Sequence, residues 1–170
     1  MKSWKMIPKE EFPLFSQPVL WLGGDFKGVT SEISTPNVEV TLQVRNLKEK
    51  SFSHKLVYDV HEIFCIQLEV KNISGEGVSH ILVSHMIRDH FAYVPSTLQA
   101  NKGRGEFLFQ LVRWRIDTLL PNEKVQLICQ LKVIRIPIPS SIPLRATYTF
   151  KHKDLVYGPF QTKDVILIKK

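Results

Sequence analysis

Three histidines recur at five-residue intervals, at positions 80, 85 and 90. Imidazole binds metal ions and transfers protons, so this spacing is the first pattern to test for chemistry. An odd spacing sends successive side chains of a strand to opposite faces, and five residues on a helix turn by about 140°. His80, His85 and His90 therefore cannot form one local ligand cluster, and no Cys or His pair has zinc spacing. We expect solvated or loop histidines and no metal site.

Sequence motifs for catalysis are missing as well. The chain contains no G-x-S-x-G, phosphate-binding glycine loop, H-E-x-x-H or dinucleotide fingerprint. The carboxylates Asp59, Glu62, Asp89 and Asp117 have no sequence neighbour that would suit them to acid–base catalysis. The sequence thus predicts no catalytic residue and no cofactor, and an enzyme is the less favoured class. The sequence leaves open whether the fold brings two carboxylates together into a catalytic pair.

The two cysteines lie in segments that alternate between apolar and polar residues. Cys65 is out of phase with Phe64 and Ile66 and is expected to face away from the core, whereas Cys129 is in phase with Leu127 and faces inward. A disulfide needs Cβ atoms that point toward each other, with Cα atoms about 4.4–6.8 Å apart. We therefore expect two free thiols, which fits synthesis in a reducing compartment.

The chain is basic, with 23 Lys and Arg against 16 Asp and Glu in 170 residues, a formal net charge of +7. This excess favours an anionic partner such as nucleic acid, an anionic polymer or lipid head groups. A solvated surface is the first interpretation and a dedicated basic patch the second, because the basic residues lie in separate segments. Those residues are Lys48, Lys50, Lys102, Arg104, Arg113, Arg115, Lys132, Arg135, Lys169 and Lys170.

Apolar runs are short, such as residues 63–66, and far below the roughly 18–20 residues of a membrane-spanning helix. The first eleven residues become acidic and contain a proline where a signal peptide would be apolar. We expect no membrane span and no signal peptide, and hence a protein that is cytoplasmic at synthesis. Its final compartment is open, with later association with the cell or spore surface as one hypothesis.

Strands, rather than helices, should position these side chains. The segments 38–44, 64–70 and 125–133 alternate with period two, which indicates half-buried antiparallel strands. We expect an all-β, Ig-like antiparallel sandwich over residues 37–170. Residues 1–36 form an irregular aromatic and proline-rich arm, packed on the sandwich or, alternatively, docking a partner. The predicted structural core is Phe64, Ile66, Leu68, Val70, Trp114, Ile116, Leu127, Cys129 and Leu131.

Turns are predicted at residues 72–77, 101–105, 120–123 and 137–143. Asn72 and Gly75 are expected to be hairpin residues, since both tolerate a positive φ, and Pro121 with Asn122 forms the turn into the strand at Val125. Near these turns, Trp114 points into the core, while Arg113 and Arg115 point into water. A single-strand nucleic-acid binder needs aromatic and basic groups on one face, so this pattern argues against it.

Two runs carry a family resemblance. Residues 66–75 (IQLEVKNISG) with 81–94, and residues 112–127 (VRWRIDTLLPNEKVQL) with 144–149, follow in order over about residues 60–150. They resemble the conserved-repeat, Ig-like domain of bacterial surface proteins, known as domain of unknown function eleven. The chain departs from that pattern at His85, Arg88, His90 and Asn122, which affects loop conformation more than fold.

The resemblance implies a non-catalytic structural or protein-interaction module, with a place in a cell-surface or spore-surface assembly as one hypothesis. Its partner would be another protein or a second copy, bound through sheet edges or loops. The alternative is a basic module that binds nucleic acid or another polyanion, with an affinity that falls steeply with salt.

Overall fold

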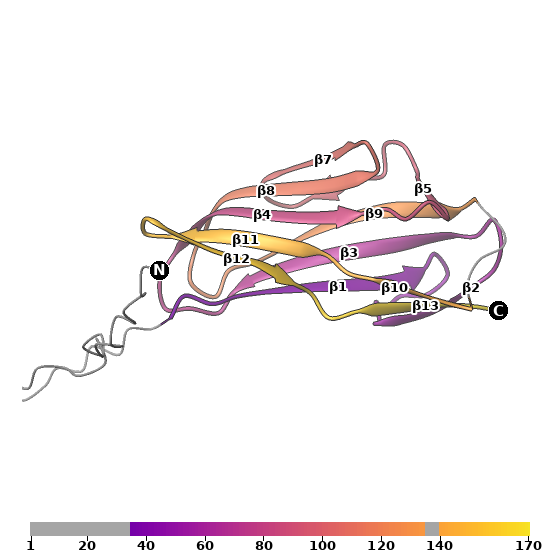
Figure 1. Ribbon diagram of the computed structural model, residues 1–170, viewed down its shortest axis with the longest axis horizontal. Coiled ribbons are helices and arrows are strands. Elements are labelled where there is room, and N and C mark those ends of the chain that lie inside the picture. The colour runs from indigo at the N-terminus through magenta and orange to yellow at the C-terminus, as the bar shows by residue number, and fades with distance from the viewer. Residues whose placement is uncertain (1–34, 135–139) are drawn as a thin grey trace, which may run out of the picture. The chain divides into compact units, whose positions relative to one another are not determined.

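A computed structural model describes residues 35–134 and 140–170 (Figure 1). The predicted arm, residues 1–36, lies outside the described residues except for its last two positions, so its packing stays a prediction. No helix in the described part is long and apolar enough to cross a membrane. The described residues form strands β1 (Val38–Asn46), β2 (Lys55–Tyr58), β3 (Ile63–Asn72), β4 (Val78–Met86), β5 (Phe91–Tyr93), β6 (Gln99–Ala100), β7 (Arg104–Leu108), β8 (Leu111–Leu119), β9 (Lys124–Val133), β10 (Ser141–Leu144), β11 (Thr147–His152), β12 (Leu155–Gln161) and β13 (Val165–Lys169).

The strands make three sheets. The first sheet has the order β1-β3-β9-β5, with β6 also paired to β9, and the second has the order β12-β11-β4-β8-β7. A small third sheet, β10-β13-β2, contains a parallel pair, β13 with β2. All other strand pairs in the described part are antiparallel. The all-β sandwich expected from the alternating sequence is confirmed.

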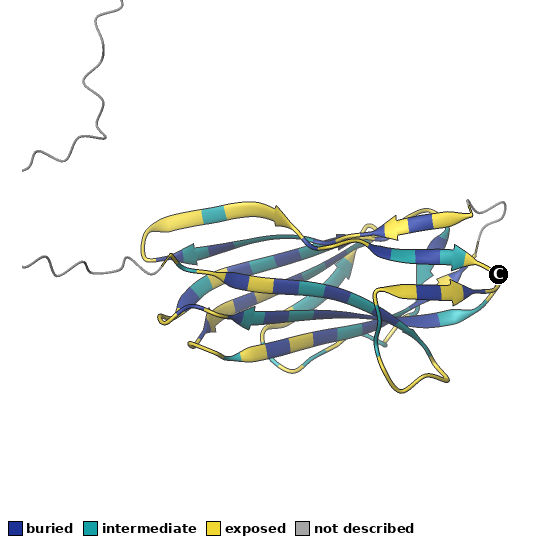
Figure 2. Cartoon of the chain, turned by 90° about the horizontal axis from the view of Figure 1, so that it is seen from below, coloured by how far each residue is buried: buried dark blue, intermediate teal, exposed yellow. Residues whose placement is uncertain are grey.

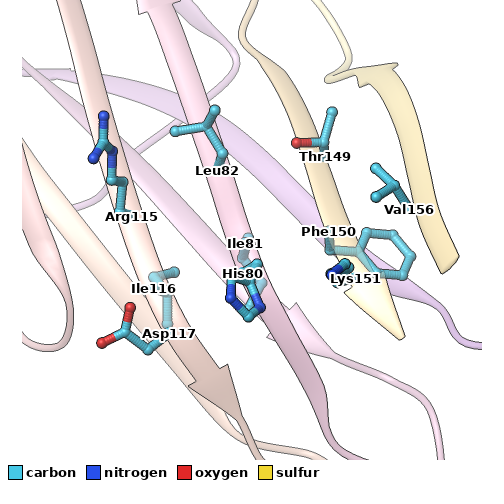
Figure 3. A pocket seen from close by; sticks show the side chains of 10 residues that line it. All are labelled: His80, Ile81, Leu82, Arg115, Ile116, Asp117, Thr149, Phe150, Lys151 and Val156. Carbon is cyan, nitrogen blue, oxygen red and sulfur yellow. The ribbon is translucent and has the colours of Figure 1, made fainter. Parts of the chain in front are cut away.

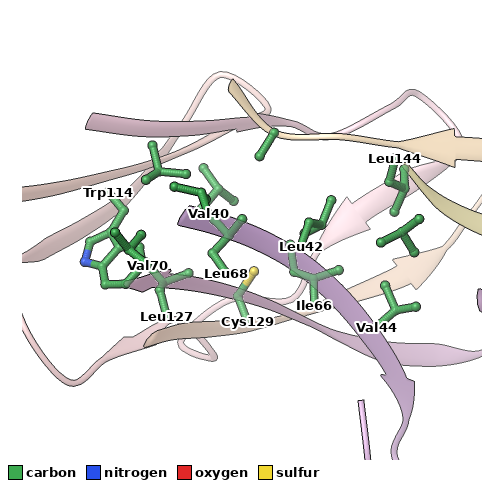
Figure 4. Packing of buried hydrophobic residues seen from close by; sticks show 14 of the residues in the cluster. Val40, Leu42, Val44, Ile66, Leu68, Val70, Trp114, Leu127, Cys129 and Leu144 are labelled. Carbon is green, nitrogen blue, oxygen red and sulfur yellow. The ribbon is translucent and has the colours of Figure 1, made fainter. Parts of the chain in front are cut away.

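The core lies between the first and second sheets and continues onto the small third sheet, which contributes Leu144 among others (Figure 4). Period-two alternation places one side of each central strand there, and paired positions such as Leu68 and Leu127 share that side. Each fully buried side chain of leucine size stabilises the fold by about 1.5–3 kcal/mol relative to exposure. The structure buries Phe64, Ile66, Leu68, Val70, Trp114, Ile116, Leu127, Cys129 and Leu131, each with at most 1% of its surface exposed.

One end of the sandwich is organised by Asn72, the last residue of β3. Its side chain is completely buried; its Nδ2 donates to the carbonyl oxygens of Glu76 (2.8 Å) and Leu119 (3.1 Å). Its Oδ1 accepts the backbone N–H of Ser74 at 3.0 Å. Neither Asn72 nor Gly75 adopts the positive φ that both residue types tolerate. The side chain of Asn72 shapes the turn instead, so the backbone does not need the left-handed region.

The β8–β9 turn contains Pro121 and Asn122, and Asn122 has a φ of 61°. The backbone N–H of Asn122 donates to the carbonyl oxygen of Asn72 at 2.8 Å, so the two turns are bonded together. Glu123 closes the same turn by accepting the N–H of Leu120 at 2.7 Å and the ammonium of Lys102 at 2.7 Å.

The predicted turn at residues 137–143 is wrong in its second part. Residues 137–139 lie outside the described residues, and Ser141–Leu144 is strand β10. Pro143 fits there because, among the described strands, β10 pairs with β13 alone and is therefore an edge strand, the position in a sheet where proline is tolerated. The run 144–149, which carries part of the family resemblance, is divided between two strands: the chain leaves the small sheet after Leu144 and enters the second sheet at Thr147.

Candidate interaction site

The histidines occupy three different environments. His80 is exposed on β4, and His90 is half-buried with its ring edge against Phe91. His85 is 1% exposed, so the expectation of a solvated or loop residue is wrong for it. It is in phase with Ile81 and Val83, which face the core. The fold does not bring the three rings together.

The neutral form of His85 is favoured by its surroundings. Burial lowers the pKa of its imidazole, and the guanidinium of Arg88 adds to this effect, while a hydrogen bond to Arg145 opposes it. The carbonyl oxygen of Arg145, 3.0 Å from Nδ1, can only accept, so Nδ1 carries the proton. Nε2 is buried with no hydrogen-bond partner among the described residues. This residue is a structural histidine rather than a proton-transfer group.

The carboxylates considered for catalysis serve turns or face solvent. Glu62 Oε2 accepts the backbone N–H of Asp59 at 2.8 Å, which closes the loop before β3. Asp89 and Asp117 are exposed, on a loop and on β8. Within the described ranges, no group of three His, Cys, Asp or Glu side chains could hold a metal ion.

Both cysteines are free and buried. Cys65 lies on the outer side of β3, opposite Arg45 on one neighbour and Gln130 on the other, whereas Cys129 is opposite Ile66 on the core side. The prediction that they occupy opposite faces is right, but Cys65 is covered by its neighbours rather than solvated. Burial raises the pKa of both thiols, that of Cys129 to about 12.

The arginines of β7 and β8 gather on the outer face of the second sheet. Arg104 lies directly opposite Arg115, so two segments that are separate in sequence meet. Glu106 is between the β8 arginines, with Oε1 at 3.6 Å from Arg113 and 3.8 Å from Arg115. Trp114 is buried on the other face and donates to the carbonyl oxygen of Lys102 at 2.8 Å. Base stacking by Trp114 is therefore not available.

The most exposed edge of the sandwich is β12. It pairs with β11 and with no other strand of the described part, and it is exposed along almost its whole length (Figure 2). Leu155 is 64% exposed, Val156 67% and Phe160 42%. An edge strand that shows both free backbone groups and apolar side chains can bind an extended segment of another chain.

Aromatic packing supports this edge from beneath. The rings of Phe150 and Tyr157 stack with centroids 5.2 Å apart, and Phe160 contacts both Tyr148 (5.4 Å) and Phe150 (6.0 Å). At the other end of the hairpin, His152 Nε2 is 2.9 Å from a carboxylate oxygen of Glu76. Sequence reasoning missed the β11–β12 hairpin, although the turn Lys153-Asp154 after an alternating segment was a usable signal for it.

A groove of about 370 Å³ lies beside β12 on the outer face of the second sheet (Figure 3). It occurs where His80 has a φ of 48° and where the β11–β4 register shifts between Thr149 and Lys151. Such a bulge bends the strand and hollows the sheet. We call it the outer groove; its lining is His80, Ile81, Leu82, Arg115, Ile116, Asp117, Thr149, Phe150, Lys151 and Val156.

Comparison with known proteins gives a fold relationship. No family model and no curated protein matches the sequence. The crystal structure of BcpA, the major pilin subunit of Bacillus cereus, is similar with a TM-score of 0.58 and 16% identity, over 79% of this chain and 40% of that one. The major pilin SpaD of Corynebacterium diphtheriae gives 0.51 and 8%, over 76% and 34%. This chain shares its fold with bacterial major pilins. It is an Ig-like sandwich that spans less than half the length of either pilin.

Proposed function

We propose that this chain is a non-catalytic structural module of a bacterial surface assembly and that it binds another protein through the β12 edge. The observation that carries the proposal is the exposure of Leu155, Val156 and Phe160 on a strand that pairs with one other strand of the described part. Strand addition satisfies the free backbone groups, while the apolar side chains supply contact area.

The proposal includes membership of the conserved-repeat family of surface proteins. Its support is the order of the matching runs, together with the roles that the fold gives to their residues: Asn72 bonds two turns and Trp114 fills the core. The pilin fold fits the same class of protein. Location at the cell or spore surface after synthesis follows from this family assignment.

The second candidate is the basic module. The cluster of Arg104, Arg113 and Arg115 favours it, because phosphate groups bind clustered guanidinium ions. The carboxylate of Glu106 within 4 Å of two of them weakens it. The two candidates differ in salt dependence, since counterion release makes polyanion binding fall steeply as salt rises.

The test is affinity capture from lysate with the full-length protein, at low and high salt and with nuclease. The double variant Leu155→Lys/Phe160→Lys places charges on the edge, and Leu120→Lys is the matched control on an equally exposed turn residue. We expect a protein partner that persists in salt and nuclease, survives Leu120→Lys and is lost with the edge variant. Capture of nucleic acid alone, removed by salt, would instead support the basic module.

A further inference from the structure

The β7–β8 hairpin ends in an unusually apolar turn. Leu108 pairs with Leu111, and the two residues between them, Phe109 and Gln110, have φ values of 49° and 63°. Two consecutive positive φ values define a type I′ turn, which strongly favours Asn-Gly. Phenylalanine is therefore a poor choice for the turn itself, and backbone strain of this kind collects at functional positions.

The phenyl ring has no role in the core, because Phe109 is 96% exposed. A single exposed apolar residue is ordinary, but Phe109 lies beside other exposed apolar residues. Leu108 is half exposed, and Met86 of β4, which pairs with Leu111, is also exposed. We call Met86, Leu108, Phe109 and Leu111 the apolar tip. The N–H of Ile87 donates to the carbonyl oxygen of Gln110 at 2.8 Å, which fixes the turn against β4.

The same face of the same sheet carries the outer groove. Paired residues share a face, so Met86 and Leu111 lie on the side of Leu82 and Arg115, which is the outer side. The tip is at the Met86 end of β4 and the groove at the His80 end, about 15–20 Å away at 3.3 Å per residue. A tip cannot enter the groove of its own chain over that distance along one rigid sheet.

We propose that the apolar tip of one copy inserts into the outer groove of a second copy. The groove offers apolar atoms of the half-buried Leu82 and of Val156, which is 67% exposed, and its volume of about 370 Å³ has room for a phenyl ring. The rim carries the cations Arg115 and Lys151 against the single anion Asp117. Residues 107–112 (FLFQLV) carry no charge, so the tip meets no like-charge repulsion there.

Tip and groove are different surfaces, so this contact is heterologous. A pair of copies leaves one tip unused on one copy and one groove unused on the other, so association continues into an open chain of copies. The inference rests on the proposed assembly function but uses surfaces other than the residues varied in its test, Leu155 and Phe160. Neither residue lines the groove.

Sedimentation velocity of the full-length protein over a range of concentrations tests the proposal. Phe109→Asn removes the phenyl ring from the tip and places a residue there that suits a type I′ turn. Leu82→Glu places a carboxylate in the groove, next to Arg115, the residue with which Leu82 pairs. The wild-type protein should form species larger than a dimer as its concentration rises. The association constant of each variant should be about 10- to 100-fold lower than that of wild type. An equimolar mixture of the two variants retains one intact tip and one intact groove, so it should stop at a one-to-one dimer.

Three results would overturn the proposal: a wild type that is monomeric at every concentration, a Phe109→Asn protein that associates as wild type does, or a mixture that stays monomeric. Circular dichroism melting of each variant separates lost contact from lost fold. If self-association is lost while a partner is still captured at β12, the tip contact is wrong and the proposed function is still supported. If self-association is observed and no partner is captured at β12, the proposed function is wrong and the tip contact is still supported.

Discussion

The side-chain amide of Asn72 donates a hydrogen bond to the carbonyl oxygen of Leu119, 47 residues further along the chain, at 3.1 Å. This bond crosses from the first sheet to the second at one end of the sandwich. The same side chain serves Glu76 and Ser74. One residue therefore fixes the relative position of two turns.

Replacement of Asn72 should be costly for stability. Asn72→Ala leaves the buried carbonyl of Leu119 and the N–H of Ser74 without their partner, so we expect a loss of about 2–4 kcal/mol in the free energy of unfolding. Urea denaturation measures it. Gly75→Ala in the same loop is the control, because an added Cβ there meets no atom within 4 Å and the φ is not positive. Equal costs for the two variants would contradict the role given to Asn72.

Gly103 should be intolerant of any side chain. Its φ is 78°, and an added Cβ would overlap the carbonyl oxygen of Arg115. Gly103→Ala should lower the free energy of unfolding by about 2–4 kcal/mol. It should also change tryptophan fluorescence, because the neighbouring carbonyl of Lys102 accepts the indole N–H of Trp114. A variant as stable as wild type with an unchanged spectrum would show that this turn can relax.

Stability should depend on pH through His85. Burial lowers the pKa of the folded-state imidazole below the value of about 6.5 for the unfolded chain. Between the folded-state and unfolded-state pKa values, the unfolded state binds more protons than the folded state, so the free energy of unfolding rises with pH. The contribution is complete above about pH 6.5 and is lost as the pH falls toward the folded-state pKa.

Chemical denaturation of wild type and His85→Gln from pH 4.5 to 8 measures this effect. Glutamine keeps an N–H donor for Arg145 but does not titrate, so the variant should lose the part of the slope below pH 6.5. His80→Gln should keep that slope, since His80 is exposed. If His80→Gln removes the pH dependence of stability below pH 6.5 and His85→Gln preserves it, the effect does not come from His85.

Neither thiol should react in the folded protein. The nucleophile is the thiolate, and burial both blocks access and raises the pKa of Cys65 and Cys129, the latter to about 12. A thiol reagent at pH 8 should label no site in the native protein and two in denaturant. Rapid native labelling of one equivalent would mean that the cover over Cys65 opens.

Period-two alternation was enough to predict the inward face of β3 and β9 and the opposite orientations of Trp114 and Arg115. The burial of His85 was also readable, since it shares the phase of Ile81, Val83 and Ile87. Residue type points the other way, because histidine is a polar residue and is seldom fully buried. The burial of Cys65 required knowledge of its neighbours: an outward residue is covered when long side chains on two flanking strands lie over it.

The edge strand and the outer groove could not be derived from sequence. Leu155, Val156 and Phe160 look like core residues in a linear pattern, and they are exposed on a strand that has a partner on one side alone among the described strands. Strand order sets which strand is an edge, and order depends on long-range pairing. The groove likewise depends on a register shift between β4 and β11, which no local pattern encodes.

Hydrogen–deuterium exchange of the complex captured at high salt tests the central claim most directly. If a partner adds a strand to β12, amides within residues 155–161 should exchange more slowly in the complex than in the free protein, because free edge groups become hydrogen-bonded. Amides of the β8–β9 turn, residues 120–123, should be unchanged. Protection at another surface with no change in β12 would contradict the account.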